Sequence, residues 1–220
     1  MKKLDLSTVL ASAIHESKNH VGNLLFQLQS LKPHVEGTTG MGVVQQIEEG
    51  LKQINDEWVE YLYLYRLSSN GYELHYDCWS VEEFLDDQVF ALQPAAAAKQ
   101  LDLSFSVDAS LVGVFDERLM TAVISTAVYN ALRFAKTAIE LSAEREGDFL
   151  IIHVDDDGQG FVSTTSAKAH HDDDTSHTGL GLYFAELAAN AHRTQEKHGL
   201  IKRGQAPKLG GARLSIYLPQ

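Results

Sequence analysis

Apolar positions in the first third of the chain follow a helical rhythm. Over residues 10–31 and again over 44–65, large apolar residues recur mostly three or four positions apart, which predicts two helices that each bury one stripe. Ser7 is the expected amino-terminal cap of a first helix of about 25 residues. The segment 32–40 contains Pro33 and two glycines and is expected to separate the helices. The stripe residues are Leu10, Ile14, Val21, Leu24, Leu28 and Leu31, then Val44, Ile47, Leu51, Ile54, Trp58, Tyr61 and Tyr65.

Two such helices joined by a short loop form an antiparallel hairpin. Each helix of a lone hairpin has only one neighbour, and these apolar stripes are broad. Two hairpins paired into a four-helix bundle bury more of them, so the pattern predicts a homodimer. The aromatic residues Trp58, Tyr61, Tyr63 and Tyr65 are expected in the bundle core and at the domain junction rather than on a ligand platform.

After residue 69 the periodicity changes to a mixture of strands and helices. A turn-rich stretch separates the two patterns, which predicts a helical hairpin over residues 1–69 and a second domain over 70–220. The fold class is therefore α+β, with an α/β sandwich following the hairpin. Expected strands are Tyr72–Ser80, Leu101–Val107, Ala138–Ala143, Phe149–Val154 and Ala212–Leu218, with a turn at Glu144–Asp148; expected helices are Val81–Lys99, Glu117–Phe134 and Leu180–His192.

Composition and charge exclude several classes of function. The 220 residues contain 18 Lys and Arg against 30 Asp and Glu, for a net charge of −12. This excess of acid argues against binding to nucleic acid or to an anionic membrane, although not against a small nucleotide. The single cysteine, Cys78, is expected to be a small hydrophobe in a reducing compartment. Without an apolar run long enough to cross a membrane, or a signal peptide, we expect a cytoplasmic protein.

The segment His15-Glu16-Ser17-Lys18-Asn19 on the first helix is a candidate reactive site. Helical geometry places Asn19 one turn after His15 on the same face, with Glu16 beside them. A carboxylate next to an imidazole can accept its ring proton and make the other nitrogen more nucleophilic. The alternative is a solvated helix face with an incidental histidine.

Three further motifs lie in the second domain. Asp156, Gly158 and Gly160 follow a strand, where the glycines allow a tight turn and Asp156 can accept a hydrogen bond from an exocyclic amine. The segment His177-Thr178-Gly179-Leu180-Gly181-Leu182 opens a helix whose free N–H groups suit phosphate. Asn130 and Arg133 project from one helix face. Taken singly, an ordinary turn, a bare pair of glycines and a solvated face explain these motifs equally well.

The order and spacing of the motifs resemble the ATP-binding domain of histidine kinases. Asn130–Phe134 is similar to the N box of that family, Val154–Phe161 to the first glycine box, Thr178–Phe184 to the second, and Gly210–Pro219 to the closing strand. The segment around His15 resembles the H box on the dimerisation and phosphotransfer hairpin. The resemblance therefore covers nearly the whole chain.

The resemblance implies a role for each matching residue. His15 would be the phospho-acceptor and Glu16 its proton acceptor, while Asn19 occupies the position that orients a water in members that dephosphorylate their partner. ATP and Mg²⁺ are the implied cofactors, with the 162–178 loop as the lid. Asn130 would bind Mg²⁺, Arg133 the phosphates and Asp156 the adenine amino group, and the backbone at Gly158, Gly160, Thr178, Gly179 and Gly181 would approach the nucleotide.

The chain departs from the family pattern at several positions. Thr126 replaces an Asn or Glu, His177 replaces a glycine, and His20 replaces a proline. No phenylalanine-bearing box is evident in the lid. The lid residues His170, His171, Asp172, Asp173, Asp174 and His177 also permit a metal cluster, but a polar lid explains the same composition.

Three functions fit these observations. The first is a histidine kinase without its own sensor, which receives input from a separate protein or a diffusible ligand and passes phosphate to an aspartate in the receiver domain of a response regulator. The second is a histidine phosphotransfer protein with a degenerate nucleotide domain that relays phosphate between receivers. The third is an ATP-binding switch such as a serine kinase that acts on a regulatory protein. The retained glycine boxes and Asp156 favour the first over the second, and the hairpin and His15 would be idle in the third.

Overall fold

The chain folds into two compact units. The computed structural model describes residues 6–69, 71–161 and 180–220, with side chains in the first helix from Ser12 onward. Its contacts divide the chain into Met1–Tyr72 and Glu73–Gln220, and the expected join between residues 69 and 70 lies close to this division. In the described part of the chain, no helix combines the length and apolarity needed to cross a membrane.

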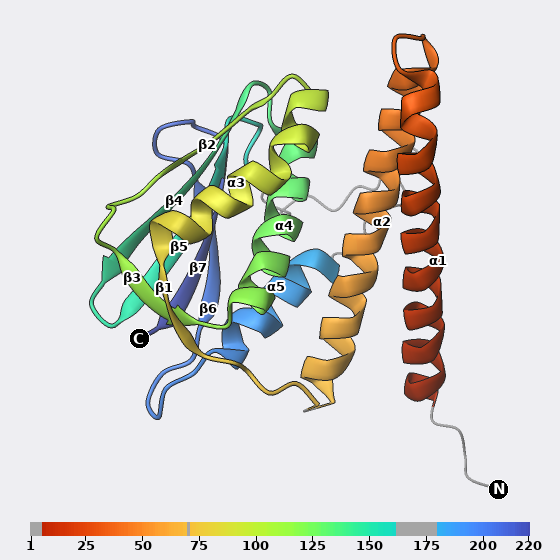
Figure 1. Ribbon diagram of the computed structural model, residues 1–220. Coiled ribbons are helices and arrows are strands. Elements are labelled where there is room, and N and C mark those ends of the chain that lie inside the picture. Colours follow the sequence, from red (N-terminus) through yellow and green to blue (C-terminus); the bar gives the residue numbers. More distant parts are fainter. Residues whose placement is uncertain (1–5, 70, 162–179) are drawn as a thin grey trace, which may run out of the picture. The chain divides into compact units, whose positions relative to one another are not determined.

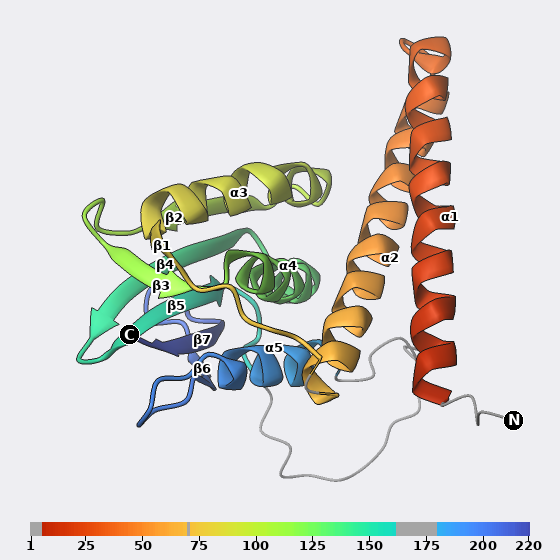
Figure 2. The same ribbon diagram turned by 60° about the horizontal axis from the view of Figure 1, so that its bottom comes forward.

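The first unit is a hairpin of two long helices that lie side by side, α1 (Leu6–Val35) and α2 (Gly40–Ser68) (Figures 1 and 2). The expected break at Lys32 is wrong, because α1 continues through Pro33 to Val35. Pro33 removes one intrahelical hydrogen bond, and because the helix ends two residues later, only its last turn is affected. Ser7 lies within the helix rather than before it, so it is not the cap that the sequence predicted.

The turn between α1 and α2 is short and locally hydrogen-bonded. Gly37 adopts the left-handed conformation at φ 76°, which glycine reaches without strain. The Thr38 hydroxyl donates to the Val35 carbonyl oxygen at 2.7 Å and accepts from the Gly40 backbone N–H at 3.2 Å. These bonds satisfy groups at both helix ends.

Apolar residues spaced by seven form the seam of the hairpin. Ile14 and Val21 of α1 and Val44 of α2 are buried. The ammonium group of Lys32 on α1 lies 2.6 Å from the carboxylate of Glu48 on α2, and hydrogen bonding to Lys32 lowers the pKa of Glu48. The seam and this ion pair therefore fix which faces of the two helices meet.

The second unit is a two-layer α/β sandwich. Three helices cover one face of a five-stranded sheet of order β2-β4-β5-β7-β6 (Figure 1). Strand β2 pairs with β4 in parallel and the other neighbours are antiparallel. The helices are α3 (Val81–Ala98), α4 (Glu117–Phe134) and α5 (Leu180–Ala191); the strands are β2 (Asp102–Ser106), β4 (Ala138–Glu146), β5 (Phe149–Asp156), β6 (Leu200–Gln205) and β7 (Ala212–Pro219).

The core lies between this sheet and the three helices. Ser80 caps α3 by accepting from the Glu83 N–H, and Asp116 caps α4 by accepting from the Leu119 N–H, as expected for residues with a side-chain oxygen at that position. Large side chains from helices and strands are almost completely buried there: Leu85, Leu119, Met120, Ile124, Ile139, Leu141, Leu150, Ile152, Phe184 and Ile216.

Four expectations about the strands need correction. Only Asp77–Ser80 of the expected strand Tyr72–Ser80 forms β1. It pairs with β3 (Val112–Phe115), which the sequence pattern did not reveal. Strand β6 was also missed, because an exposed edge strand with Lys, Arg and Gly lacks the apolar alternation of an inner strand. Strand β4 extends to Glu146, so the turn before β5 consists only of Gly147 and Asp148.

Cys78 lies on β1 and is exposed. The residue that was expected to be a small hydrophobe is therefore not part of the core. In the pairing with β3, Cys78 lies opposite Val114, which is also exposed. This two-stranded ribbon is short and turns one face to solvent, which explains why an apolar residue type on it does not imply burial.

A buried polar cluster connects the start of α4 to the end of α5. The Asp116 backbone N–H donates to Nε2 of His192 at 3.1 Å, and Nδ1 of His192 lies 2.8 Å from the Ala188 carbonyl oxygen. The acceptor role of Nε2 requires the neutral imidazole with its proton on Nδ1. Burial lowers the pKa of His192 below its ordinary value of 6.5.

The free energy of unfolding is expected to fall as the pH drops below about 6.5, because unfolded His192 takes up a proton that the folded cluster disfavours. Above that pH the imidazole is neutral in both states and this contribution is constant. His192→Gln should flatten the dependence. Urea unfolding at pH 7.5 and pH 5.5 measures it, with the exposed His198→Gln as the control. An equal slope in both variants contradicts the assignment to His192.

Candidate functional site

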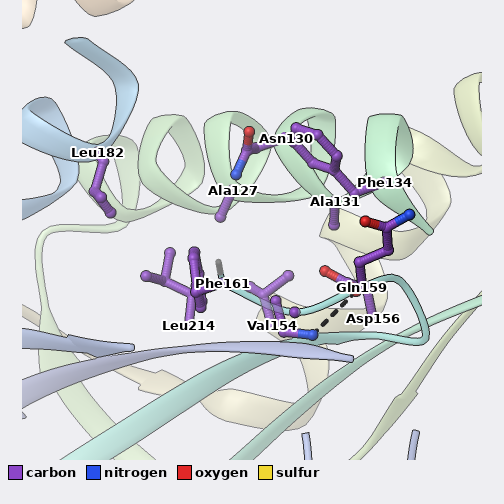
Figure 3. Close-up of a pocket in the computed structure, with 12 residues that line it drawn as sticks. Ala127, Asn130, Ala131, Phe134, Val154, Asp156, Gln159, Phe161, Leu182 and Leu214 are labelled. Atoms are coloured by element: carbon purple, nitrogen blue, oxygen red, sulfur yellow. Dashed lines mark hydrogen bonds between the residues drawn. The ribbon is translucent and has the colours of Figure 1, made fainter. Parts of the chain in front are cut away.

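A cavity of about 300 Å³ opens between α4, the end of β5 and the start of α5. Figure 3 shows Asn130 on the helix above the cavity, Asp156 on the opposite side and Leu182 at one end. Most of its walls are apolar, with a few polar groups among them, which is the usual character of a small-molecule site. The lining residues are Ala127, Asn130, Ala131, Phe134, Val154, Asp156, Gln159, Gly160, Phe161, Leu182, Ala212 and Leu214.

Asp156 is the buried carboxylate of this cavity, with 5% of its surface exposed. Its Oδ1 atom accepts hydrogen bonds from the Gly158 N–H at 2.7 Å and the Ala212 N–H at 3.1 Å. The dashed line at Asp156 in Figure 3 marks the second bond. Two backbone donors stabilise the ionised carboxylate in a place where an unpaired charge would be costly.

Gly158 is required by close packing behind Asp156. A side-chain carbon at this position would overlap the Phe134 carbonyl oxygen and approach Oδ1 of Asp156 to 2.9 Å. Gly160 lies on the cavity wall at φ 77°, a conformation in which other residues are strained. Both predicted glycines therefore shape the turn that forms one wall of the cavity.

Asp157 braces the same wall from outside the cavity, a role that the sequence did not indicate. Its carboxylate accepts from the Lys136 N–H at 2.7 Å, the Thr137 N–H at 3.0 Å and the Thr137 hydroxyl at 2.6 Å. Partial burial alone would raise the pKa of Asp157, but these hydrogen bonds hold it far below its ordinary value. The bonds join the turn after α4 to the end of β5, so they connect the two sides of the cavity.

Asp155, on the other face of β5, pairs with Arg213 on β7. The guanidinium donates from Nε to Oδ1 at 2.7 Å and from Nη2 to Oδ2 at 2.6 Å. Such a two-pronged ion pair is specific in geometry as well as in charge. It raises the pKa of Arg213 and ties β5 to β7 immediately before Asp156.

Asn130 and Arg133 differ in their relation to the cavity. Asn130 is on its lining, and its amide oxygen is a suitable ligand for a hard cation such as Mg²⁺. The Arg133 guanidinium lies over the ring of Phe134, 5.3 Å from its centre, and Arg133 is not on the lining. Among the described residues no group of three or more His, Cys, Asp or Glu is placed to hold a metal ion.

Several predicted residues fall at or beyond the limits of the described chain. Gly181 lies in the first turn of α5, beside Leu182 of the lining. Thr178, Gly179, the expected lid over 162–178 and its histidines and aspartates lie outside the described residues. Conversely, the sequence did not single out Phe134, Gln159, Leu182, Ala212 or Leu214 as pocket residues, because apolar lining residues carry the same pattern as core residues.

The predicted phospho-acceptor segment lies on the exposed surface of α1. His15, Glu16 and Asn19 are all exposed. Nδ2 of Asn19 lies 3.4 Å from Nδ1 of His15, at the long end of the hydrogen-bond range. The helix therefore places an accessible imidazole next to an amide and a carboxylate, as the sequence predicted from helical spacing.

Comparison with known families finds a match for most of the second unit. Residues 115–220 match the family described as "Histidine kinase-, DNA gyrase B-, and HSP90-like ATPase". This segment of the chain is similar to that family. It begins at the end of β3 and includes the Asp156 pocket.

Known sequences extend the similarity to the hairpin. The sensor protein PhoQ of Escherichia coli strain K12 is 26% identical over 95% of this chain and 42% of its own length. The sensor histidine kinase CpxA of the same strain is 36% identical over 46% of this chain and 22% of its own length. The chain thus spans less than half the length of these curated relatives.

Solved structures agree with the fold of both units. The histidine kinase AdeS of Acinetobacter baumannii has a TM-score of 0.61 at 15% identity, over 90% of this chain and 94% of its own. Full-length ShkA, crystallised in complex with AMPPNP, has a TM-score of 0.66 at 21% identity, over 96% of this chain and 45% of its own. The chain therefore shares the fold of these histidine kinases, a helical hairpin followed by an α/β sandwich.

Proposed function

We propose that this protein is a histidine kinase that transfers the γ-phosphoryl group of ATP to the imidazole of His15. The observation that carries the proposal is the cavity with its buried, backbone-bonded carboxylate at Asp156, in a domain of the histidine kinase-like ATPase family. The accessible His15–Asn19 segment on a separate helical hairpin supplies the acceptor.

The cavity supports binding of an adenine nucleotide. The apolar side chains of Val154, Ala131 and Leu214 line it and suit the faces of a purine ring. Asp156 offers a carboxylate oxygen to the exocyclic amino group. The start of α5, where Gly181 lies, offers backbone N–H groups and the positive end of the helix dipole to phosphate. With a net charge of −12, such local groups rather than the overall field must hold the phosphates.

The proposed reaction is an in-line displacement. The lone pair of one His15 ring nitrogen forms a bond to the γ-phosphorus, and the bond to the bridging oxygen breaks to release ADP. The other ring nitrogen gives up its proton, for which the neighbouring Glu16 carboxylate is the acceptor. When bound, Mg²⁺ would neutralise phosphate charge, and the Asn130 side-chain oxygen would hold it. The protein otherwise contributes positioning.

The phosphoryl group then passes to a response regulator. Phosphohistidine is the donor, an aspartate carboxylate in a receiver domain is the acceptor, and the imidazole is regenerated. The exposed position of His15 supports this step, because a second protein must reach the same nitrogen. We also propose that Asn19 orients a water molecule that hydrolyses the partner's phosphoaspartate, which releases inorganic phosphate and regenerates the carboxylate.

The hairpin is proposed to form a homodimer. Seven-residue spacing places Ile14, Val21 and Val44 on the seam within the hairpin, whereas Leu24, Leu31, Ile47 and Ile54 lie three positions further and are 43–47% exposed. This second apolar stripe runs beside the first on both helices. Pairing with a second hairpin buries it, as in a four-helix bundle.

Ile47→Glu should convert the dimer to a monomer, because it places a charge in the middle of the second stripe. Sedimentation velocity of the full chain measures the association state. Gln46→Glu is the matched control, since it adds the same carboxylate to the neighbouring exposed position on the far side of α2. If both variants sediment alike, or if the wild-type chain is a monomer, the proposed bundle is wrong.

Incubation with γ-labelled ATP and Mg²⁺ should produce an acid-labile, base-stable phosphoprotein. His15→Gln should abolish the label because the acceptor nitrogen is lost. Asp156→Asn should reduce it by tenfold or more, because a hydrogen bond to a charged group in a buried site contributes on the order of 1.5–3 kcal/mol. His20→Gln, on the same helix, is the control and should label normally.

Two results would contradict the kinase proposal. Label that persists in His15→Gln would place the acceptor elsewhere. A chain that takes no label from ATP but accepts phosphate from a phosphorylated receiver would be a phosphotransfer protein instead.

Asn19→Ala should slow dephosphorylation of the phosphorylated receiver at least tenfold and leave autophosphorylation within about twofold, because the amide orients water rather than the nucleotide. Both rates are followed by the loss or gain of labelled phosphate on the two separated proteins. Ser17→Ala is the control on the same helix. An equal loss of both activities in Asn19→Ala would show that the amide acts on the histidine itself.

A further inference from the structure

Gly211 occupies the tightest contact between the end of β5 and the start of β7. It is buried, and its backbone N–H donates to the Asp156 carbonyl oxygen at 3.1 Å. Its own carbonyl oxygen accepts from the Ala206 N–H at 2.9 Å. Gly211 is thus held on both sides by backbone bonds, directly behind the carboxylate that faces the cavity.

The space behind Asp156 has no room for a side chain. A Cβ at position 211 would overlap the Asp156 carbonyl oxygen and the Gly158 nitrogen, and would lie 2.6 Å from Oδ1 of Asp156. The first two are backbone atoms that cannot move aside without separating β5 from β7. The third is the carboxylate itself, so any added atom pushes on the group that forms the polar end of the cavity.

This packing determines which oxygen of Asp156 faces the cavity. Oδ1 is held by the N–H groups of Gly158 and Ala212. Oδ2 accepts no hydrogen bond from the residues that the structure describes. A carboxylate that is fixed at one oxygen cannot rotate, so it presents a single, oriented acceptor.

We propose that Gly211 is a positioning residue for nucleobase selection. It holds Asp156 so that Oδ2, rather than Oδ1, is the carboxylate oxygen that faces the purine. A 6-amino purine donates an N–H to this oxygen. A 6-oxo purine presents a carbonyl oxygen that repels it, and a carboxylate free to turn would lose this discrimination. The inference rests on the proposed binding of an adenine nucleotide.

The test compares the dissociation constants of ATP and inosine triphosphate, which differ at position 6 of the purine. Titration calorimetry on the full chain should give at least tenfold tighter binding of ATP to the wild type. In Gly211→Ala the ratio should fall to within about threefold of unity, mainly through weaker ATP binding. Asp156→Asn is the reference for loss of the carboxylate, and should favour inosine triphosphate because its amide can donate to the 6-oxo group.

The matched control is Gly204→Ala on the neighbouring strand β6. Gly204 pairs with Arg213 on β7, two residues after Gly211, yet nothing lies within 4 Å of the added carbon. This variant should bind both nucleotides as the wild type does. It separates the effect of position 211 from a general effect of replacing glycine in this sheet.

If Gly211 had a purely structural role, Gly211→Ala would weaken the binding of both nucleotides equally. An unchanged ratio of the two dissociation constants in this variant therefore overturns the proposal. If Gly211→Ala unfolds, a backbone ester in place of the Gly211–Ala212 amide, introduced by semisynthesis, removes the second Oδ1 donor without adding a side-chain atom at either position. The same fall in ratio is expected there, and retention of the wild-type ratio overturns the proposal.

The nucleotide titration tests the positioning role of Gly211, and the labelling experiment tests the kinase activity, so either proposal can fail without the other. A wild type that binds both nucleotides equally overturns the positioning role whatever the phosphorylation result. A wild type that discriminates but does not label His15 overturns the kinase activity alone.

Discussion

The close approach of β5, β7 and the end of α4 is the constraint on which the candidate site depends. Gly158 lies against the Phe134 carbonyl oxygen and Gly211 against the backbone of Asp156, so these three segments meet with no side chain between them. That contact lets backbone N–H groups from two different segments reach one carboxylate oxygen. The apolar walls of the cavity consist of residues that α4 and the sheet turn toward each other.

The carboxylates beside this contact each have hydrogen-bond partners close to them in the structure. Each of the three consecutive carboxylates has its own hydrogen-bonding partners: Arg213 for Asp155, two backbone N–H groups for Asp156, and the 136–137 turn for Asp157. In a chain with a net charge of −12, unsatisfied carboxylates at this density would repel one another and any phosphate. Because Asp155 and Asp157 are bonded elsewhere and Asp156 is held at Oδ1, one oriented carboxylate oxygen is left to face the cavity.

Much of the fold and part of the site follow from the sequence, and the failures have physical causes. The helix Glu117–Phe134 was predicted with its observed bounds, because a strong apolar stripe runs between a capping aspartate and a strand. The strand β6 was missed because edge strands carry charge, and the extension of α1 was missed because proline was taken as a break rather than a residue of the last turn. Asp156 and Gly158 were found from local spacing. Gly211 and Asp157 were not assigned such roles, since these depend on segments about 20 to 55 residues away in the chain.

The run Asp155-Asp156-Asp157 also bears on how β5 finds its place in the sheet. If β5 shifted so that Asp156 took the place of Asp155 opposite Arg213, Asp157 would take the place of Asp156 at the cavity. The carboxylates alone therefore do not exclude this shifted register. The register is instead specified by Leu150, Ile152 and Val154, because the shifted strand would turn these side chains away from the helices. Within β5, the carboxylate that lines the cavity and the apolar residues that fix the alignment are thus different residues.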